Sequence, residues 1–338
     1  MQFRLTTDRQ ARSFSASSTL TAPSNEPFKT HLPVKHSEPT VHSFYHKSTS
    51  TFSYVVAGSP YDAESGVLDV VIIDSVLDYD AASGSVTTES ADGLMSFCAA
   101  QNYRVTAVLE THAHADHLSA GFYISRSLHV GHLNRVANPP LIIGKGIEEV
   151  QRRFAPRYGL TQGDLQGSFD LLIDEKMNLR VGNSRINAIH LPGHTPDHMG
   201  YQIGENIFTG DVVFLPDVGS ARADFPGGSA DLLRASIHRL LDASPQTRLY
   251  VGHDYPPPSR ADPKCFSTIS ETQHENVHLK NMDDFVQRRL IRDKELAAPR
   301  LLHPSLQVNI RGGRLPPPGP DGVSRMQIPL TAGSANLL

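Results

Sequence analysis

The stretch of the chain best suited to chemistry is 111–117, which carries three histidines and one aspartate: His112, His114, Asp116 and His117. Neutral imidazole and carboxylate groups are preferred ligands of zinc and iron in proteins. His112 and His114 are two residues apart, so at the end of an extended strand they point the same way, whereas helical metal motifs place ligands three or four residues apart. The spacing therefore predicts a metal site in a loop that follows a strand. A solvated histidine cluster is the alternative for this stretch taken alone.

Three later turns supply more side chains of the same type. His194, Asp211 and His253 each come directly after a glycine, at the end of an expected strand or in a turn. In α/β enzymes, binding groups gather in loops along one edge of a sheet. Four separate strand ends that each present ligand-type residues therefore predict one shared metal centre.

The elements that must position these ligands follow from hydrophobic periodicity. Strands are expected at 48–57, 67–73, 105–109, 141–143, 177–181, 185–190, 199–203, 206–209 and 247–251. Helices are expected at 91–101, 118–128, 147–155, 230–241, 268–280 and 283–298, with Ser229 as the N-cap of the fourth. The succession of helix, strand, metal loop and helix around 111–117 is typical of an α/β protein.

Length and composition restrict the class of protein. A chain of 338 residues can bury one large core, so one catalytic domain with extensions is the simplest organisation. Charged residues make up 20% and the formal net charge is -4, which argues against a nucleic-acid-binding surface. Cys98 and Cys265 are too few for a disulfide framework. No apolar run reaches the roughly 18 residues of a membrane span, so we expect a soluble protein with neither nucleic acid nor membrane as a partner.

The N-terminal segment differs from the rest of the chain. It is rich in Ser, Thr and Pro, so we expect a disordered extension at 1–46 and a catalytic domain at 47–338 that ends in a helical and Pro-rich extension. Before Glu26, arginines are interspersed with serines and Asp8 is the single acidic residue, which is typical of a mitochondrial transit peptide. The mitochondrial matrix is therefore the expected location. An ordinary disordered tail on a cytoplasmic protein is the alternative.

Taken together, these ligands resemble those of the metallo-β-lactamase superfamily, whose His-x-His-x-Asp-His signature is followed by single His, Asp and His ligands in that order. The resemblance covers about residues 48–260. It implies an α/β fold, the αββα four-layer sandwich, in which two mixed β-sheets are flanked by helices and the metal lies at one edge of the sheets. Seven positions match the ligands of the family: His112, His114, Asp116, His117, His194, Asp211 and His253.

Several local stretches are similar to the persulfide dioxygenase (sulfur dioxygenase) branch of that superfamily: 111–120, 210–214, 222–228, 253–255, 304–310 and 315–318. This resemblance implies one Fe(II) per chain, held by His112, His194 and Asp211. A two-His, one-carboxylate set leaves positions open for a persulfide and O2. The implied reaction is the oxidation of glutathione persulfide with O2 to sulfite and glutathione, in mitochondrial sulfide detoxification. The segment between His117 and His194 is longer than in the shortest family members, so the substrate-side loops are not predicted.

The same resemblance implies roles for the other residues of the site. Four of them would orient the iron ligands and hold water without binding a second metal: His114, Asp116, His117 and His253. Tyr255 would contribute to catalysis and substrate binding by a hydrogen bond near the iron or the substrate sulfur. Arg222 would support the active-site loop or bind the anionic glutathione, and a structural salt bridge is its alternative. A homodimer is a possible assembly.

Because all seven ligand positions are occupied, a different enzyme stays open as the main alternative. It is a binuclear zinc thioester hydrolase of the glyoxalase II type, with two Zn(II) per chain and a glutathione thioester as substrate. A non-catalytic protein that kept the fold is less favoured, because such a protein usually loses a ligand.

Overall fold

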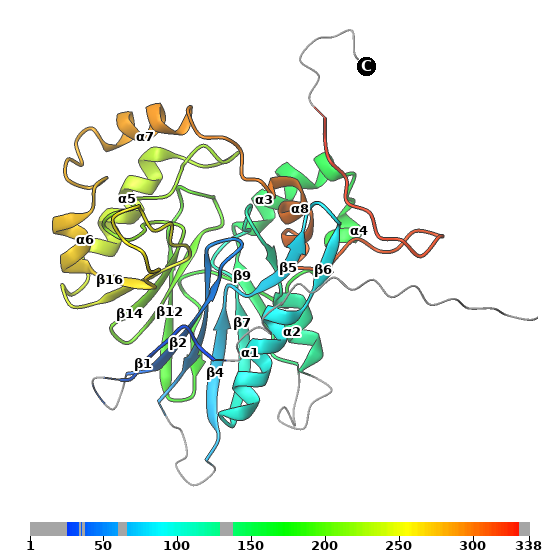
Figure 1. The fold of residues 1–338 in the computed structure, drawn as a ribbon, viewed down its shortest axis with the longest axis horizontal. Helices are drawn as coiled ribbons and strands as arrows, with labels where there is room; N and C mark the ends of the chain where they lie inside the picture. The colour runs from blue at the N-terminus through cyan, green and yellow to red at the C-terminus, as the bar shows by residue number, and fades with distance from the viewer. Residues whose placement is uncertain (1–25, 34, 36–37, 60–65, 129–137, 331–338) are drawn as a thin grey trace, which may run out of the picture.

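The computed structural model describes residues 26–33, 35, 38–59, 66–128 and 138–330. Two β-sheets that face each other form its centre (Figure 1). The first sheet has seven strands, in the spatial order β1 (Lys29–His31), β2 (Thr40–His46), β3 (Thr51–Ala57), β4 (Leu68–Ile73), β7 (Tyr103–Leu109), β9 (Leu141–Gly144) and β10 (Leu171–Ile173). The second has six, in the order β11 (Leu179–Val181), β12 (Ser184–His190), β13 (Met199–Ile203), β14 (Asn206–Gly210), β15 (Arg248–Val251) and β16 (Phe266–Thr268). A small third sheet joins β6 (Ser85–Thr87), β5 (Val76–Asp80) and β8 (Leu118–Ser119).

Aromatic side chains fill the space between the two large sheets. Tyr54 of β3 lies with its ring centroid 5.0 Å from that of Phe208 in β14 and 5.5 Å from that of Tyr250 in β15. All three are fully buried, and the Tyr54 hydroxyl donates a hydrogen bond to the Val251 carbonyl oxygen at 2.6 Å. Buried aromatic rings contribute large apolar areas and a defined geometry, so these contacts fix the sheets relative to each other.

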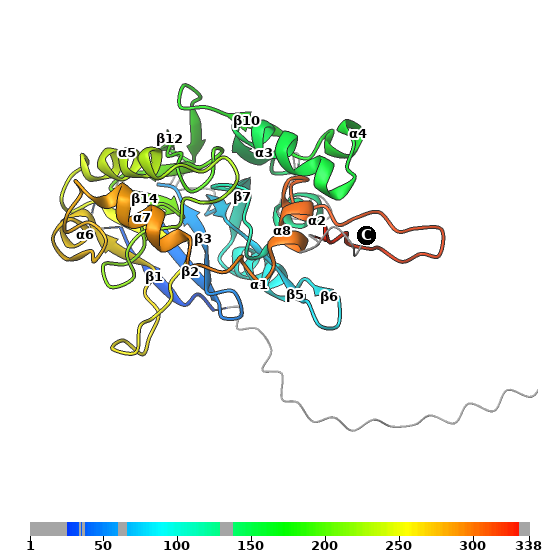
Figure 2. The ribbon, with the colours of Figure 1, turned by 90° about the horizontal axis from the view of Figure 1, so that it is seen from above.

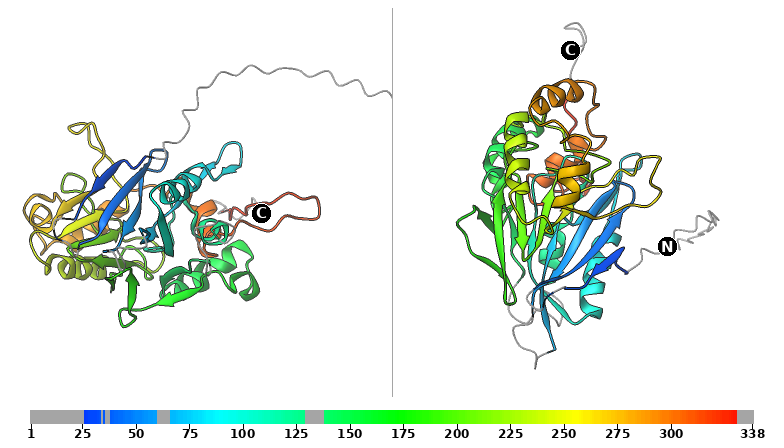
Figure 3. Two further views of the ribbon diagram at one scale, coloured as in Figure 1. Left: turned by 90° about the horizontal axis from the view of Figure 1, so that it is seen from below. Right: turned by 90° about the vertical axis from the view of Figure 1, so that its left-hand side faces the viewer.

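Helices cover both outer faces, as Figures 2 and 3 show. They are α1 (Glu89–Ala100), α2 (Gly121–Ser127), α3 (Ile147–Phe154), a 3-10 turn (Ala155–Tyr158), α4 (Gln162–Leu165), α5 (Ala230–Leu241), α6 (Ile269–Glu275), α7 (Phe285–Asp293) and α8 (Leu302–Asn309). Helices α1 and α2 pack on the first sheet and α5 packs on the second. Ser229 caps α5 by accepting a hydrogen bond from the Leu232 N–H, as predicted. The αββα arrangement expected from the sequence is therefore confirmed.

Strand direction brings the predicted ligands to one edge. β4 pairs in parallel with β7, and β14 pairs in parallel with β15. The carboxyl ends of parallel partners lie on the same side, and the chain leaves β7, β14 and β15 directly before residues 111–117, Asp211 and His253. The two sheets therefore present their ligand-bearing loops together.

The N-terminal boundary expected from the sequence is wrong. β1 and β2 lie inside the segment 1–46, which we expected to be disordered, and β2 pairs with β3 along its whole length, from Thr40 opposite Ala57 to His46 opposite Thr51. Because β2 carries several polar side chains, it lacks the apolar pattern from which strands are predicted. The arginine- and serine-rich start of the chain, before residue 26, lies outside the described residues.

The C-terminal segment packs on the domain as expected, and part of it is helical. Residues 302–309 form α8, in which Pro304 occupies the first turn, where a backbone N–H is not needed for the helix. Leu306 and Ile310 are buried against α3 and the metal loop. Beyond them, the Gln327 N–H donates to the Gln307 side-chain oxygen at 2.9 Å. In the described part of the chain, no helix has the length and apolarity needed to cross a bilayer.

Candidate metal centre

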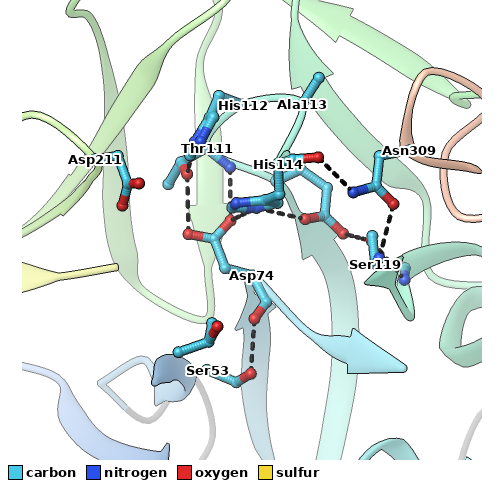
Figure 4. Close-up of polar contacts among 12 residues, drawn as sticks. Ser53, Asp74, Thr111, His112, Ala113, His114, Ser119, Asp211 and Asn309 are labelled. Atoms are coloured by element: carbon cyan, nitrogen blue, oxygen red, sulfur yellow. Dashed lines mark hydrogen bonds and ion pairs between the residues drawn. The ribbon is translucent and has the colours of Figure 1, made fainter. Parts of the chain in front are cut away.

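The loop between β7 and β8 carries four of the predicted ligands, and side chains from distant elements fix its backbone (Figure 4). Asp74, directly after β4, accepts hydrogen bonds from the Thr111 N–H at 2.7 Å and from the Thr111 hydroxyl at 2.9 Å. Asp197, from the loop before β13, accepts one from the Ala113 N–H at 2.8 Å. The loop is thus anchored to both large sheets.

Asn309, the last residue of α8, holds the other half of this loop. Its side-chain amide donates to the carbonyl oxygens of His114 at 2.8 Å and of His117 at 2.7 Å, and its oxygen accepts from the Ser119 N–H at 2.8 Å. The side chain is 3% exposed, so loss of these bonds would leave buried polar groups unpaired. The C-terminal segment therefore belongs to the framework of the site.

His112, His194 and Asp211 form one compact group of donors. One ligand atom from each lies within 4.8 Å of those of the other two, and all three residues are buried. His112 Nε2 and Asp211 Oδ1 have no hydrogen-bond partner among the described residues. Buried polar atoms are nearly always paired, so two unpaired atoms within one compact group of donors fit a bound metal ion.

Hydrogen bonds set the tautomers of both histidines. The Thr111 hydroxyl gives its proton to Asp74, so at 2.9 Å from His112 it accepts from the Nδ1–H of that ring. His194 Nδ1 lies 2.8 Å from the Arg222 carbonyl oxygen, which can only accept. In each ring, Nε2 therefore carries the lone pair. Burial, followed by the charge of His114, lowers the pKa of His112 well below its usual range, which keeps this imidazole neutral.

A second group of four donors lies beside the first: His114, Asp116, His117 and His253. Their ligand atoms also lie within 4.8 Å of one another. His253 Nε2 is 3.1 Å from Asp116 Oδ2 and 3.6 Å from Asp211 Oδ1, so Asp211 lies between the two groups. The Thr51 hydroxyl is 3.3 Å from His253 Nδ1 and 3.5 Å from His117 Nδ1.

His114 differs from the other histidines because two buried carboxylates face it. Its Nε2 lies 3.2 Å from Asp74 Oδ1 and 3.3 Å from Glu110 Oε2. Burial lowers the pKa of His114, but the two carboxylates outweigh burial and raise this pKa well above its usual range. Glu110 in turn accepts a short hydrogen bond from the Ser119 hydroxyl. His114 is therefore tied into a charged network behind the loop.

His198 is a residue of the site that sequence reasoning missed. Its Nε2 accepts a hydrogen bond from the Asp211 backbone N–H at 2.9 Å, and its ring stacks on that of His112 with 4.7 Å between centroids. Burial, followed by the charge of His194, lowers the pKa of His198 well below its usual range, so it accepts as a neutral ring. The only signal in the sequence is a further histidine four residues after His194.

A cavity of about 500 Å³ opens over the donors. Asp116, His194 and Asp211 line it on one side, and the β2–β3 turn at 48–50 lines it on another. Tyr255 also lines it, and its ring stacks on that of His253 with 5.7 Å between centroids. Tyr255 is 48% exposed, and a tyrosine hydroxyl is protonated at neutral pH, so it can donate a hydrogen bond into the cavity.

Arg222 lines the same cavity, but its guanidinium is already engaged. It forms two hydrogen bonds with Asp224, at 2.6 and 2.7 Å, and a third with the Ala297 carbonyl oxygen at 2.7 Å. These contacts correspond to the structural salt bridge that we considered as the alternative for this residue. They tie the loop after Asp211 to the segment that follows α7.

Comparison with known proteins agrees with this geometry. The sequence model of the metallo-beta-lactamase superfamily matches residues 69–253, so the chain belongs to that superfamily. A probable metallo-hydrolase of Burkholderia pseudomallei is 42% identical over 308 residues, which cover 87% of this chain and 99% of that protein. A protein of Dictyostelium discoideum named glyoxylase B2 is 40% identical over 265 residues, covering 77% and 88%. Among solved structures, ETHE1 from Myxococcus xanthus superposes with a TM-score of 0.61 at 23% identity, covering 81% and 99%.

These comparisons define the class of protein: a metalloenzyme of the metallo-beta-lactamase superfamily. The two relatives carry hydrolase-like names, and the solved structure supports the fold. Membership of the superfamily does not determine which reaction the protein catalyses, because that depends on the residues of the site.

Proposed function

We propose that this protein is a mononuclear non-haem iron persulfide dioxygenase, which oxidises glutathione persulfide with O2 to sulfite and glutathione. The observation that carries this proposal is the separation of the donors into two groups. His112, His194 and Asp211 form a group of two imidazoles and one carboxylate, without His114. Two imidazoles and one carboxylate on one face are the ligand set of non-haem Fe(II) oxygenases.

The environment of His114 supports this separation. Its Nε2 lies 3.2 Å from Asp74 Oδ1 and 3.3 Å from Glu110 Oε2. A histidine held by two carboxylates is well suited to stabilise the loop and the negative charge of the site. The proposal therefore gives His114 an electrostatic role in place of a role as a ligand.

The reaction balances with water as the only other reactant. Both atoms of O2 add to the terminal sulfur of glutathione persulfide, which gives a glutathione-bound sulfinate. Water then cleaves the sulfur–sulfur bond, so that sulfite leaves and glutathione takes up the proton on its thiol. Fe(II), when bound, supplies the electron-rich centre at which O2 is activated.

The residues of the chain bind and orient the reactants. Tyr255 would donate a hydrogen bond to the persulfide sulfur in the cavity that it lines. The ring of His253 stacks on that of Tyr255, and Asp116 Oδ2 lies 3.1 Å from His253 Nε2. The mitochondrial matrix and the homodimer remain proposals that accompany this function.

A second candidate is a binuclear zinc thioester hydrolase of the glyoxalase II type. The specific observation in its favour is the second group of donors, in which every residue has one atom without a hydrogen-bond partner among the described residues: His114 Nδ1, Asp116 Oδ2, His117 Nε2 and His253 Nε2. The name of the Dictyostelium relative also agrees with it. In that enzyme, the metals would lower the pKa of water for attack on a glutathione thioester.

Paired activity assays separate the two candidates. The protein is purified without oxygen, loaded with Fe(II) or with Zn(II), and supplied with glutathione persulfide or with S-lactoylglutathione. We expect O2 uptake and sulfite formation in a ratio of about one to one with Fe(II) and the persulfide. Thioester hydrolysis by the zinc form, without O2 uptake by the iron form, would instead establish the hydrolase.

A further inference from the structure

Two cavities meet at the turn between β2 and β3. Residues 48–50 of this turn line the cavity over the metal donors. His46, the last residue of β2, lines another cavity of about 410 Å³, together with Phe28 and Ser90. The side chain of His46 is 13% exposed, so solvent reaches it. His46 and Thr49 therefore line different cavities, although they are three residues apart in the chain.

A series of hydrogen bonds connects the two cavities. The Thr49 hydroxyl lies 2.6 Å from His46 Nδ1 and 2.8 Å from the Thr51 hydroxyl. Thr51 in turn contacts His253 Nδ1 at 3.3 Å, inside the second group of donors. At the other end, His46 Nε2 lies 3.2 Å from Asp78 Oδ1. The polar side chains thus run from the donors, through the turn, to a partly exposed carboxylate on β5.

The partners of Asp78 set the direction of these hydrogen bonds. Burial alone would raise the pKa of Asp78, but hydrogen bonds from His46 and Ser90 outweigh burial and lower this pKa. The ionised carboxylate accepts from His46 Nε2–H, and the Ser48 hydroxyl also lies 3.2 Å from this nitrogen. His46 Nδ1 therefore carries the lone pair and accepts from the Thr49 hydroxyl. The Thr49 oxygen faces the Thr51 hydroxyl with its own lone pairs free to accept.

Both candidate reactions leave one proton to remove from a buried site. In the oxygenase, the oxygen of water bonds to the oxidised sulfur of the glutathione-bound sulfinate, and the sulfur–sulfur bond breaks with its electron pair on the glutathione sulfur. One proton of the water goes to that sulfur, and the second must leave when sulfite forms. Hydrolysis of a thioester likewise gives a carboxylate, a thiol and one proton. The donors are buried, so this proton needs a path to solvent.

We propose that His46 carries this second proton from the active-site cavity to solvent through the hydroxyl of Thr49. The water in the cavity gives its proton to the Thr49 oxygen, while the Thr49 hydroxyl passes its own proton to His46 Nδ1. His46 then releases its Nε2 proton towards Asp78 and the water of the second cavity. The ring regains its first tautomer by exchange of protons with that water. Imidazole suits this role because it accepts a proton at one nitrogen and releases one from the other.

His46 acts through Thr49, so the test must distinguish proton transfer from a structural contribution. O2 uptake and bound iron are measured for the wild type, His46→Gln, His46→Ala, Thr49→Val and Thr49→Ser. We expect kcat to fall about 10-fold to 100-fold in the first three variants, with KM and bound iron unchanged, because a proton-transfer step becomes rate-limiting. The solvent deuterium isotope effect on kcat should increase in these variants. Thr49→Ser keeps the hydroxyl and should retain the wild-type kcat.

Added imidazole provides the decisive comparison. It should restore most of the lost kcat in His46→Ala, where it can occupy the space of the missing ring, and should leave the wild type and Thr49→Val unchanged. His42→Gln is the matched control, because His42 lies in the same strand, bonds the Thr30 hydroxyl at 2.9 Å and the Tyr103 hydroxyl at 3.0 Å, and lines neither cavity. Its kcat should stay within about twofold of the wild type.

Two results would overturn the proposal. One is a wild-type kcat in both His46 variants, and the other is a loss of kcat that imidazole does not restore and that leaves the isotope effect unchanged. The inference rests on the proposed function only for the reaction in which it is measured. If the wild type takes up no O2 with glutathione persulfide, the proposed function fails. The same variants are then compared in hydrolysis of S-lactoylglutathione by the zinc form, with the same expected losses and the same rescue.

Discussion

Replacing Thr111 by valine removes one hydroxyl that links Asp74 to His112. The hydroxyl donates to Asp74 Oδ2 at 2.9 Å and accepts from His112 Nδ1 at 2.9 Å. Valine has nearly the same shape, so the backbone hydrogen bond from Thr111 to Asp74 at 2.7 Å is kept. The substitution therefore isolates the effect of the hydroxyl on the tautomer and orientation of His112.

The expected size of the effect follows from these two bonds. A hydrogen bond to a charged group contributes about 1.5–3 kcal/mol and a neutral one about 0.5–1.5 kcal/mol. His112 is 1% exposed, so water cannot replace the lost partner. We expect the free energy of unfolding to fall by about 2–4 kcal/mol, and the affinity for Fe(II) to fall about 10-fold to 100-fold, as is common when a group that orients a ligand is removed.

Anaerobic competition with a chelator of known affinity measures this change. Thr106→Val is the matched control, because Thr106 lies in β7, the strand before the metal loop, and its hydroxyl donates to the carbonyl oxygen of Val70 in β4 at 3.1 Å. The control should bind Fe(II) within about twofold of the wild type. Wild-type affinity in Thr111→Val would refute the role assigned to the hydroxyl.

Three further predictions concern the framework, the pH dependence and the donors. Asn309→Ala removes three hydrogen bonds of 2.7–2.8 Å from the metal loop, so the free energy of unfolding should fall by about 2–4 kcal/mol in denaturant titrations, and an unchanged midpoint would contradict the anchoring role of α8. Burial lowers the pKa of His42 from 6.5 to about 4, so between these pH values the unfolded chain binds more protons than the folded chain. The stability that is present above pH 6.5 is therefore lost as the pH falls through 4. His42→Gln should reduce this loss by about 1–2 kcal/mol after allowance for solvent screening, and an unaltered pH profile would exclude His42 as its source. Asp211→Ala should lose both bound iron and O2 uptake, whereas full retention of both would show that the site is misassigned.

The sequence correctly predicted those elements whose apolar residues repeat with the period of a helix or a strand. The helix expected at 230–241 is α5 to the residue, because its apolar positions repeat at helical spacing and Ser229 caps it. β2 was missed because its buried side chains include His42 and Ser43, which are satisfied by distant partners, Tyr103 and Lys29. Tertiary hydrogen bonds of this kind have no signature in the strand itself.

The site shows the same division. The predicted donors were found because a short motif and three glycine-flanked turns share one chemistry. Asp74, Asp197 and Asn309 were not found, because each is a single polar residue whose partner lies far along the chain: Thr111, Ala113 and the carbonyl oxygens of 114 and 117. The gathering of the strand ends at one edge was predicted, but the groups that hold the metal loop appear only in the folded chain.

The number and identity of the bound metal ions test the central proposal most directly. We would measure them by elemental analysis of the protein purified without oxygen, for the wild type, Asp116→Asn and Asp211→Asn. One iron per chain that persists in Asp116→Asn and is lost in Asp211→Asn is the result expected for a centre held by His112, His194 and Asp211. Two zinc ions per chain, one of which is lost in Asp116→Asn, would contradict it.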